Sequence, residues 1–117
     1  MPNAREVVEQ HLAAFNTHDS ERLLAGFTDD AIWATGEDVM RGRTALADLF
    51  DDSLWDLQPQ LSVVSLVAGE QTVAAELREQ IIVGHERRNF RIAVFFTVID
   101  GLIVNAKVYR EGVADIE

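Results

Sequence analysis

Charged and apolar side chains alternate along residues 72–83, and this period of two predicts a β-strand. One face of the strand would hold Glu76, Arg78 and Gln80, and the other Ala75, Leu77, Glu79 and Ile81. A carboxylate and a guanidinium two residues apart can pair, which would hold Arg78 as a fixed donor for a ligand oxygen. Glu76 and Arg78 are therefore catalytic candidates, although the same pair could be a structural ion pair between the sheet and a helix.

A histidine, His11, lies on the apolar side of an amphipathic segment that begins the chain. Its neighbours on that side are Val8, Leu12 and Phe15. In such a setting an imidazole with a pKa near neutrality could act as an acid, a base or a hydrogen-bond donor in a pocket. A lone histidine on an apolar face can equally be an ordinary core residue.

Asp38, with Glu37 beside it, occupies the expected loop 37–42, where a carboxylate could serve as a base near a pocket mouth. The alternative is a solvated loop acid. The aspartate doublets at 29–30 and 51–52 lack the spaced oxygen ligands of a calcium loop, and the chain has no cysteine. No metal and no cofactor is implied.

Large apolar residues recur on several of the expected elements and could line a cavity for a small hydrophobic ligand. They are Trp33, Met40, Phe50, Trp55, Ile92, Val94, Phe96 and Val108. The alternative is that these side chains fill the core and leave no cavity.

The elements that must position these residues change in kind along the chain. Helical spacing predicts helices over residues 4–15, 20–27 and 43–54, with a short strand at 31–35. Period-two segments then predict strands over 60–67, 72–83, 87–99 and 102–110, joined by short turns and hence antiparallel. Residues 90–99 are apolar on both sides, so we expect helices on one face of the sheet and a second copy of the chain on the other, as a homodimer.

Length and charge exclude several classes of protein. With 117 residues, 48% of them hydrophobic, the chain is expected to form one domain over residues 1–117. A net charge of −10 makes nucleic acid and anionic membranes poor partners. No apolar stretch approaches the roughly 18 residues of a membrane helix, and the first residues lack a secretory signal. We therefore expect a cytoplasmic protein.

Four landmarks in this order resemble the SnoaL-like members of the nuclear transport factor 2 superfamily. They are Phe15-Asn16-Thr17-His18-Asp19, Phe27-Thr28-Asp29-Asp30-Ala31, Arg41-Gly42-Arg43-Thr44-Ala45-Leu46 and Asp100-Gly101-Leu102-Ile103. The resemblance implies an α+β cone, in which a strongly curved, mostly antiparallel sheet wraps around the N-terminal helices and leaves a pocket at one end. The superfamily includes ketosteroid isomerases, limonene epoxide hydrolases and polyketide cyclases, as well as domains that only bind or dimerise.

Most catalytic positions implied by the resemblance hold other residue types. The isomerase oxyanion tyrosine falls on His11, the isomerase base on Thr35 and its second aspartate on Val94. The hydrolase Arg-x-Asp falls on Arg78-Glu79-Gln80, a register that would point Glu76, Arg78 and Gln80 into the cone, and the hydrolase's last-strand aspartate falls on Val108.

We therefore expect a mostly apolar pocket that binds a small hydrophobic molecule. If the protein is an enzyme, the expected activity is acid–base isomerase, hydrolase or cyclase chemistry. The alternative is a non-catalytic dimerisation or ligand-sensing module. The catalytic candidates are His11, Asp38, Glu76 and Arg78, and Phe15, Thr35 and Gln80 join the apolar set as ligand-binding candidates.

Overall fold

The computed structural model describes residues 2–111 and begins with two capped helices. Helix α1 spans Ala4–Asn16, where the Asn3 side chain accepts from the Glu6 N–H and the Glu6 side chain accepts from the Asn3 N–H. Because these two bonds satisfy donors that a helix start leaves free, they fix where α1 begins. Helix α2 spans Ser20–Ala25 and begins at Asp19, whose side chain accepts from the Arg22 N–H.

The expected helix over 43–54 is two helices, α3 at Gly42–Leu49 and α4 at Asp52–Trp55. Phe50 leaves the helical conformation, and Asp51 then caps α4 by accepting from the Ser53 N–H at 2.9 Å. The break turns the Phe50 ring into the core, where it is 2% exposed. Burial of this aromatic side chain therefore accounts for the interruption.

Six strands form one sheet in the order β2-β1-β6-β5-β4-β3. Their bounds are β1 Phe27–Thr35, β2 Asp38–Arg41, β3 Gln60–Ala68, β4 Thr72–Val83, β5 Glu86–Ile99 and β6 Leu102–Arg110. Only the β1–β6 pair is parallel among the pairs formed by these strands. Residues 38–41, expected to be loop, are therefore an edge strand that returns along β1 after the turn at Gly36, which has φ +60°.

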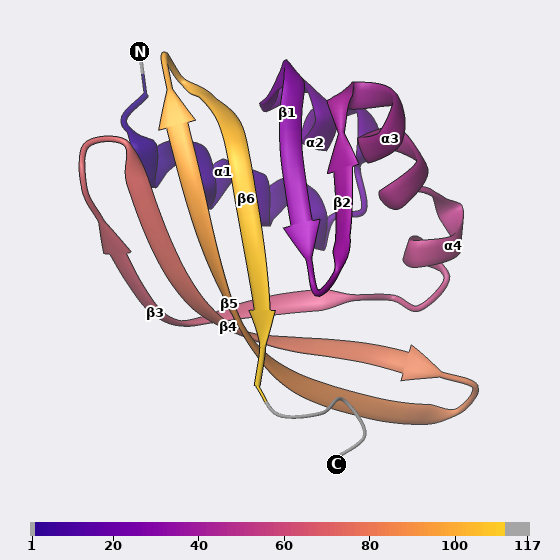
Figure 1. Cartoon of the computed structure of the whole chain (residues 1–117). Coiled ribbons are helices and arrows are strands. Elements are labelled where there is room, and N and C mark those ends of the chain that lie inside the picture. The colour runs from indigo at the N-terminus through magenta and orange to yellow at the C-terminus, as the bar shows by residue number, and fades with distance from the viewer. Residues whose placement is uncertain (1, 112–117) are drawn as a thin grey trace.

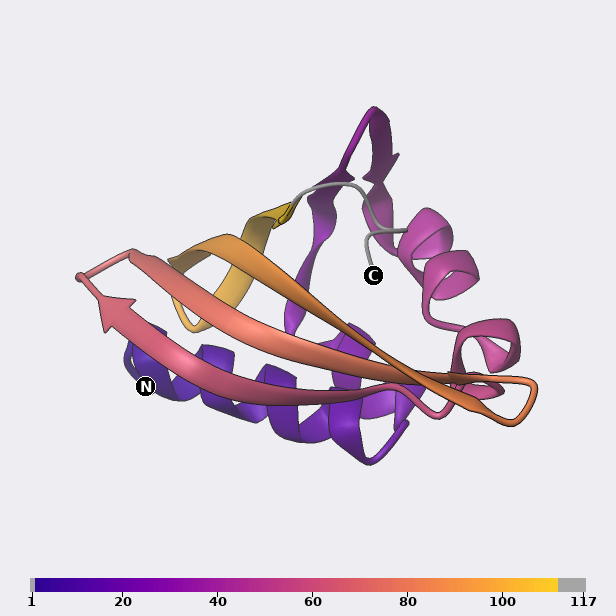
Figure 2. The same ribbon diagram turned by 90° about the horizontal axis from the view of Figure 1, so that it is seen from below.

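The sheet is strongly curved, and α1 lies against its inner face (Figure 1). Figure 2 shows β3, β4 and β5 bending over α1, with α3 and α4 on the other side of the interior. The core fills the space between them, with Val8, Phe27, Leu77, Ile103 and Ala106 fully buried. This arrangement confirms the expected α+β cone with a mostly antiparallel sheet.

The outer face of the sheet exposes several large apolar side chains. Strand pairing places Val67, Ala74 and Phe95 in one row on that face, and Tyr109 lies on the same side. Phe95 is 47% exposed and Tyr109 is 50% exposed, and their rings meet edge to face at 5.8 Å. Exposed apolar groups gathered on one face are typical of an interaction surface. None of the helices within residues 2–111 has the length and hydropathy to span a bilayer.

Candidate functional site

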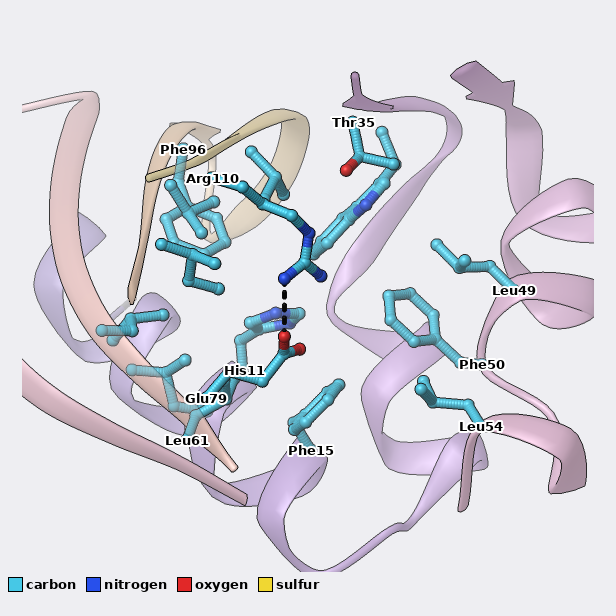
Figure 3. Close-up of a pocket in the computed structure, with 16 residues that line it drawn as sticks. His11, Phe15, Thr35, Leu49, Phe50, Leu54, Leu61, Glu79, Phe96 and Arg110 are labelled. Carbon is cyan, nitrogen blue, oxygen red and sulfur yellow. Dashed lines mark hydrogen bonds and ion pairs between the residues drawn. The ribbon is translucent and has the colours of Figure 1, made fainter. Parts of the chain in front are cut away.

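A cavity of about 130 Å³ lies inside the cone, between α1, the inner face of the sheet and the α3–α4 segment. Sixteen side chains line it, and most are apolar (Figure 3). They are His11, Leu12, Phe15, Trp33, Thr35, Leu49, Phe50, Leu54, Leu61, Leu77, Glu79, Ile92, Val94, Phe96, Val108 and Arg110.

His11 is the buried polar residue of this wall. Its imidazole meets the rings of Phe27 and Phe96 edge to face at 5.5 and 5.3 Å, and the ring of Trp33 lies 5.9 Å away. The Nδ1 atom has no hydrogen-bond partner among the described residues. Burial lowers the pKa of His11 from 6.5 to about 4, below the near-neutral value expected from the sequence. His11 is therefore a neutral imidazole at pH 7, with one ring nitrogen that donates a hydrogen bond and one that accepts.

Glu79 and Arg110 are the charged residues among those that line the cavity. The Arg110 Nη1 atom donates to Glu79 Oε1 at 2.8 Å, and Figure 3 shows the two side chains reaching toward each other across the space beside His11. Glu79 is 13% exposed and Arg110 is 41% exposed, which places the carboxylate inside and the guanidinium nearer to solvent. The Arg110 guanidinium also lies 5.6 Å from the centre of the Phe90 ring.

The sheet brings these two residues together although 31 positions separate them in the sequence. Glu79 on β4 pairs with Phe90 on β5, and Arg110 on β6 pairs with Ile92, two residues further along β5. Both side chains therefore lie on the inner face, with β5 between them. Long side chains can reach such a diagonal neighbour across a curved sheet.

The expectation that Glu76, Arg78 and Gln80 point into the cone is wrong. Along β4 the buried residues are Val73, Ala75 and Leu77, and Glu79 continues the same face. Glu76 lies on the outer face, where its carboxylate is 3.5 Å from Arg91, and Arg78 is exposed. The physical reason is that the helices cover the apolar face of the strand, so its charged face turns to solvent.

Eight of the eleven ligand-binding candidates from the sequence line the cavity. They are Phe15, Trp33, Thr35, Phe50, Ile92, Val94, Phe96 and Val108. Thr35 contributes a hydroxyl to an otherwise apolar part of the wall (Figure 3).

Met40 and Trp55 do not line the cavity, contrary to expectation. Met40 lies in β2 opposite Trp33 and packs on the core.

Trp55 lies behind Phe15, with 5.3 Å between the ring centres, and its indole Nε1–H donates to the Ser20 hydroxyl at 2.7 Å. The indole is also stacked on His18, whose Nε2 atom is 2.9 Å from the Pro59 carbonyl oxygen. Trp55 therefore supports the wall from outside.

Asp38 is also absent from the cavity wall. It pairs with Thr35 at the end of the β1–β2 hairpin, but its side chain is exposed to solvent. Because this carboxylate is exposed and does not line the cavity, it does not replace the acid that the resemblance implies at Thr35. Within residues 2–111, no three acidic or imidazole side chains gather as a metal site would require.

Glu79 and Arg110 are the residues that sequence reasoning missed. The signal for Glu79 was present in the alternation of Val73, Ala75 and Leu77, whose apolar face continues to Glu79. Alternation on β6 likewise places Arg110 on the face of the buried Ala106 and Val108. The pairing of Arg110 with Glu79 had no such signal, because β4 is not a neighbour of β6 in the sheet.

Comparisons with known proteins agree with this architecture. SalBIII, an epoxide hydrolase/cyclase-like enzyme described in pyran ring formation in the polyether salinomycin, superposes with a TM-score of 0.85 at 24% identity, over 95% of this chain and 92% of that one. An LEH-like epoxide hydrolase from M. tuberculosis superposes with a TM-score of 0.82 at 24% identity, over 91% of this chain and 80% of that one. A protein of ketosteroid isomerase-like fold from Catenulispora acidiphila, in complex with trimethylamine, superposes with a TM-score of 0.79 at 14% identity, over 89% of this chain and 84% of that one.

These likenesses concern the fold, since all three identities are below 25%. None of the curated proteins matches the chain. The model of the SnoaL-like domain, in contrast, matches residues 8–106, from within α1 to the middle of β6. The chain belongs to the SnoaL-like domain family.

Proposed function

We propose that the protein binds a small, mostly hydrophobic molecule in the cavity and converts it by acid–base chemistry, with Glu79 as the proton acceptor. The observation that carries this proposal is a nearly buried carboxylate held at 2.8 Å by Arg110 in a cavity whose other walls are mostly apolar. A general base must reach a bound ligand, and Glu79 lines the space that the ligand would fill.

The proposed roles follow from the charges of the three groups. Glu79 takes a proton from an acidic carbon, a hydroxyl group or a water molecule, and the positive guanidinium of Arg110 offsets negative charge that develops on the ligand. The neutral His11 lines the cavity, and the N–H of its ring donates a hydrogen bond to a ligand oxygen. Apolar walls keep bulk water away and strengthen both interactions.

Proton removal is the shared first step of the isomerase, hydrolase and cyclase reactions that we consider. The similarity to epoxide hydrolase and cyclase-like proteins supports this group of reactions, while fold alone does not select among them. In isomerisation the proton returns from Glu79 at another carbon. In hydrolysis or cyclisation of an epoxide, the oxygen of water or of an internal hydroxyl forms a bond to one epoxide carbon while the C–O bond at that carbon breaks. The proton that Glu79 removed then passes to the alkoxide.

A ligand screen tests the proposal. Compounds of about one ring, such as monocyclic terpene epoxides and cyclic hydroxy ketones, are chosen to fit the cavity of about 130 Å³. An increase in the melting temperature of the protein identifies those that bind the folded state. Each stabilising compound is then incubated with the protein and separated by chromatography with mass detection. The proposal expects a product of equal mass or of added water. Stabilising compounds that all remain unconverted contradict the catalytic part.

That contradiction would favour the second candidate function, a ligand-sensing module without chemistry. This function is favoured by three other residues that line the cavity, Thr35, Val94 and Val108, because none of them is an acid. Binding without conversion is its expected result.

We also propose that two copies of the chain associate through the outer face of the sheet. The support is the exposed apolar set on that face, in which Phe95, Tyr109 and Val67 are between 47% and 67% exposed. Burial of this surface against an identical one would remove it from water.

A further inference from the structure

Resting on the proposed function, we infer that the cavity selects neutral molecules, about one ring in size, that carry a hydrogen-bond donor next to an acceptor. Amides and hydroxy ketones belong to this class. The inference rests on the ion pair of Glu79 and Arg110 on the inner face. In this pair one nitrogen of Arg110 donates to one oxygen of Glu79.

The pair leaves both kinds of hydrogen-bonding group available. One carboxylate oxygen of Glu79 accepts from one guanidinium nitrogen of Arg110, and no further bond of either side chain is formed within the described residues. A guanidinium has five N–H donors and a carboxylate has two acceptor oxygens. A ligand can therefore accept from Arg110 and donate to Glu79 at the same place, without breaking the existing contact.

The charge balance of the cavity favours a neutral ligand. Glu79 and Arg110 neutralise each other, and His11 is uncharged at pH 7. An anionic ligand would place a second negative charge beside the Glu79 carboxylate, and a cationic ligand a second positive charge beside Arg110. In a mostly apolar cavity either added charge loses its hydration without a free countercharge to replace it.

The net charge of the whole chain adds to the exclusion of anions. At −10, the field of the protein repels an approaching anion.

The cavity volume sets the size of the ligand. At about 130 Å³ it resembles the apolar cavity of about 150 Å³ that is known to hold benzene. The aromatic side chains of Phe15, Phe50 and Phe96 offer ring faces and edges to a flat ligand. A single ring therefore fits the walls, and one polar group on that ring would reach the Glu79–Arg110 pair.

The test uses four probes of one ring: benzamide, benzoate, benzylammonium and toluene. Each is titrated into the 117-residue chain at pH 7 and fixed ionic strength. The dissociation constants come from amide and indole NMR shifts, and shifts at Trp33 and Phe96 mark cavity occupancy. Toluene has no polar group and reports only whether the cavity takes a ring. We expect benzamide to bind at least tenfold more tightly than benzoate and benzylammonium.

Two substitutions change the charge at the pair and should change the preference. Glu79→Gln leaves Arg110 without a countercharge, so benzoate should gain at least tenfold relative to benzamide. Arg110→Gln leaves Glu79 uncompensated, so benzylammonium should gain by a similar factor. Arg91→Gln serves as the matched control, because it disrupts the equivalent pair with Glu76 on the outer face and should leave the order of the probes unchanged.

Each result separates this inference from the proposed function on which it rests. Equal affinities of the three polar probes, or a benzoate preference that Glu79→Gln does not increase, overturn the selection of neutral ligands even if toluene binds. Binding of toluene with shifts at Trp33 keeps the ligand-binding cavity in that case. Absence of cavity shifts with all four probes contradicts both the inference and the proposed binding function.

Discussion

The carboxylate of Glu79 on β4 and the guanidinium of Arg110 on β6 meet at 2.8 Å on the inner face of the sheet, although β5 lies between their strands. A second pair, Glu76 and Arg91, lies on the outer face of the same region with 3.5 Å between its nearest atoms. The two pairs have the same chemical types and differ in position. They therefore provide an internal comparison for the function and the stability of the protein.

The inner ion pair should contribute more to stability than the outer one. In a double-mutant cycle of Glu79→Gln and Arg110→Gln, we expect a coupling of about 1 kcal/mol, kept modest because Arg110 is 41% exposed to solvent. Urea unfolding at pH 7 provides the four free energies. The cycle of Glu76→Gln and Arg91→Gln is the control and should give a smaller coupling, since both of its partners are more than 40% exposed. A larger coupling in the outer pair would contradict the account.

The buried His11 predicts a loss of stability in acid. Its pKa is about 4 in the folded protein and about 6.5 when unfolded, so the unfolded chain takes up the proton first as the pH falls. The contribution of this group is complete above pH 6.5 and is lost between pH 6.5 and about 4, on the order of 3 kcal/mol. Unfolding free energies measured across that range check the prediction.

His11→Phe is the control for this pH dependence, because it removes the titrating group and keeps a ring in the aromatic cluster. The difference between wild type and variant should have the pH slope assigned to His11, while the acidic residues contribute equally to both. Identical slopes for the two proteins would mean that His11 is not buried as described.

Asn16 at the end of α1 holds the edge strand β3 in place. Its side chain accepts from the Leu61 N–H at 2.7 Å and donates to the Leu61 carbonyl oxygen at 3.0 Å, and Leu61 lines the cavity. Asn16→Ala should lower the unfolding free energy by about 2 kcal/mol because both backbone groups lose their partner. Asn89→Ala, at an exposed position on β5, is the control and should change it by less than about 0.5 kcal/mol. Equal effects at the two positions would contradict this role of Asn16.

The proposed association of two copies predicts a mass of about twice 13.1 kDa in light scattering. Phe95→Lys places a charge in the centre of the outer face and should shift the mass to that of a single chain at the same concentration. Val83→Lys alters an exposed apolar residue at the end of β4 and should leave the mass unchanged. A wild-type mass near 13.1 kDa at all concentrations would exclude this dimer.

The order of the elements and the fold could be predicted because they depend on periodicity. The strand at 72–83 was predicted with the bounds of β4, and 102–110 with those of β6. The short strand β2 was missed because its four residues are mostly exposed and show no alternation of buried and exposed positions. The break between α3 and α4 was missed because it depends on the burial of Phe50 in the core. Such burial comes from tertiary packing and cannot be predicted from helical spacing in the sequence.

The choice of the catalytic carboxylate failed for a different reason. Alternation divides β4 into two faces, but it does not state which face the helices cover. Val73, Ala75 and Leu77 show that the inner face is the one that continues to Glu79, and the register taken from the hydrolase resemblance favoured the other face with Glu76. Arg110 shares a face of β6 with the buried Ala106 and Val108, but its contact with Glu79 could not be predicted because that contact crosses β5.

The central claim is that Glu79, on the inner face, performs the chemistry and that Glu76, three residues earlier on β4 and on the outer face, does not. The most direct measurement is the rate of conversion of a compound that stabilises the wild-type protein, compared among wild type, Glu79→Gln and Glu76→Gln. The account predicts a loss of about 10² to 10⁴-fold for Glu79→Gln with binding retained, and a rate within about twofold of wild type for Glu76→Gln. An unchanged rate in Glu79→Gln, or a comparable loss in Glu76→Gln, would contradict it.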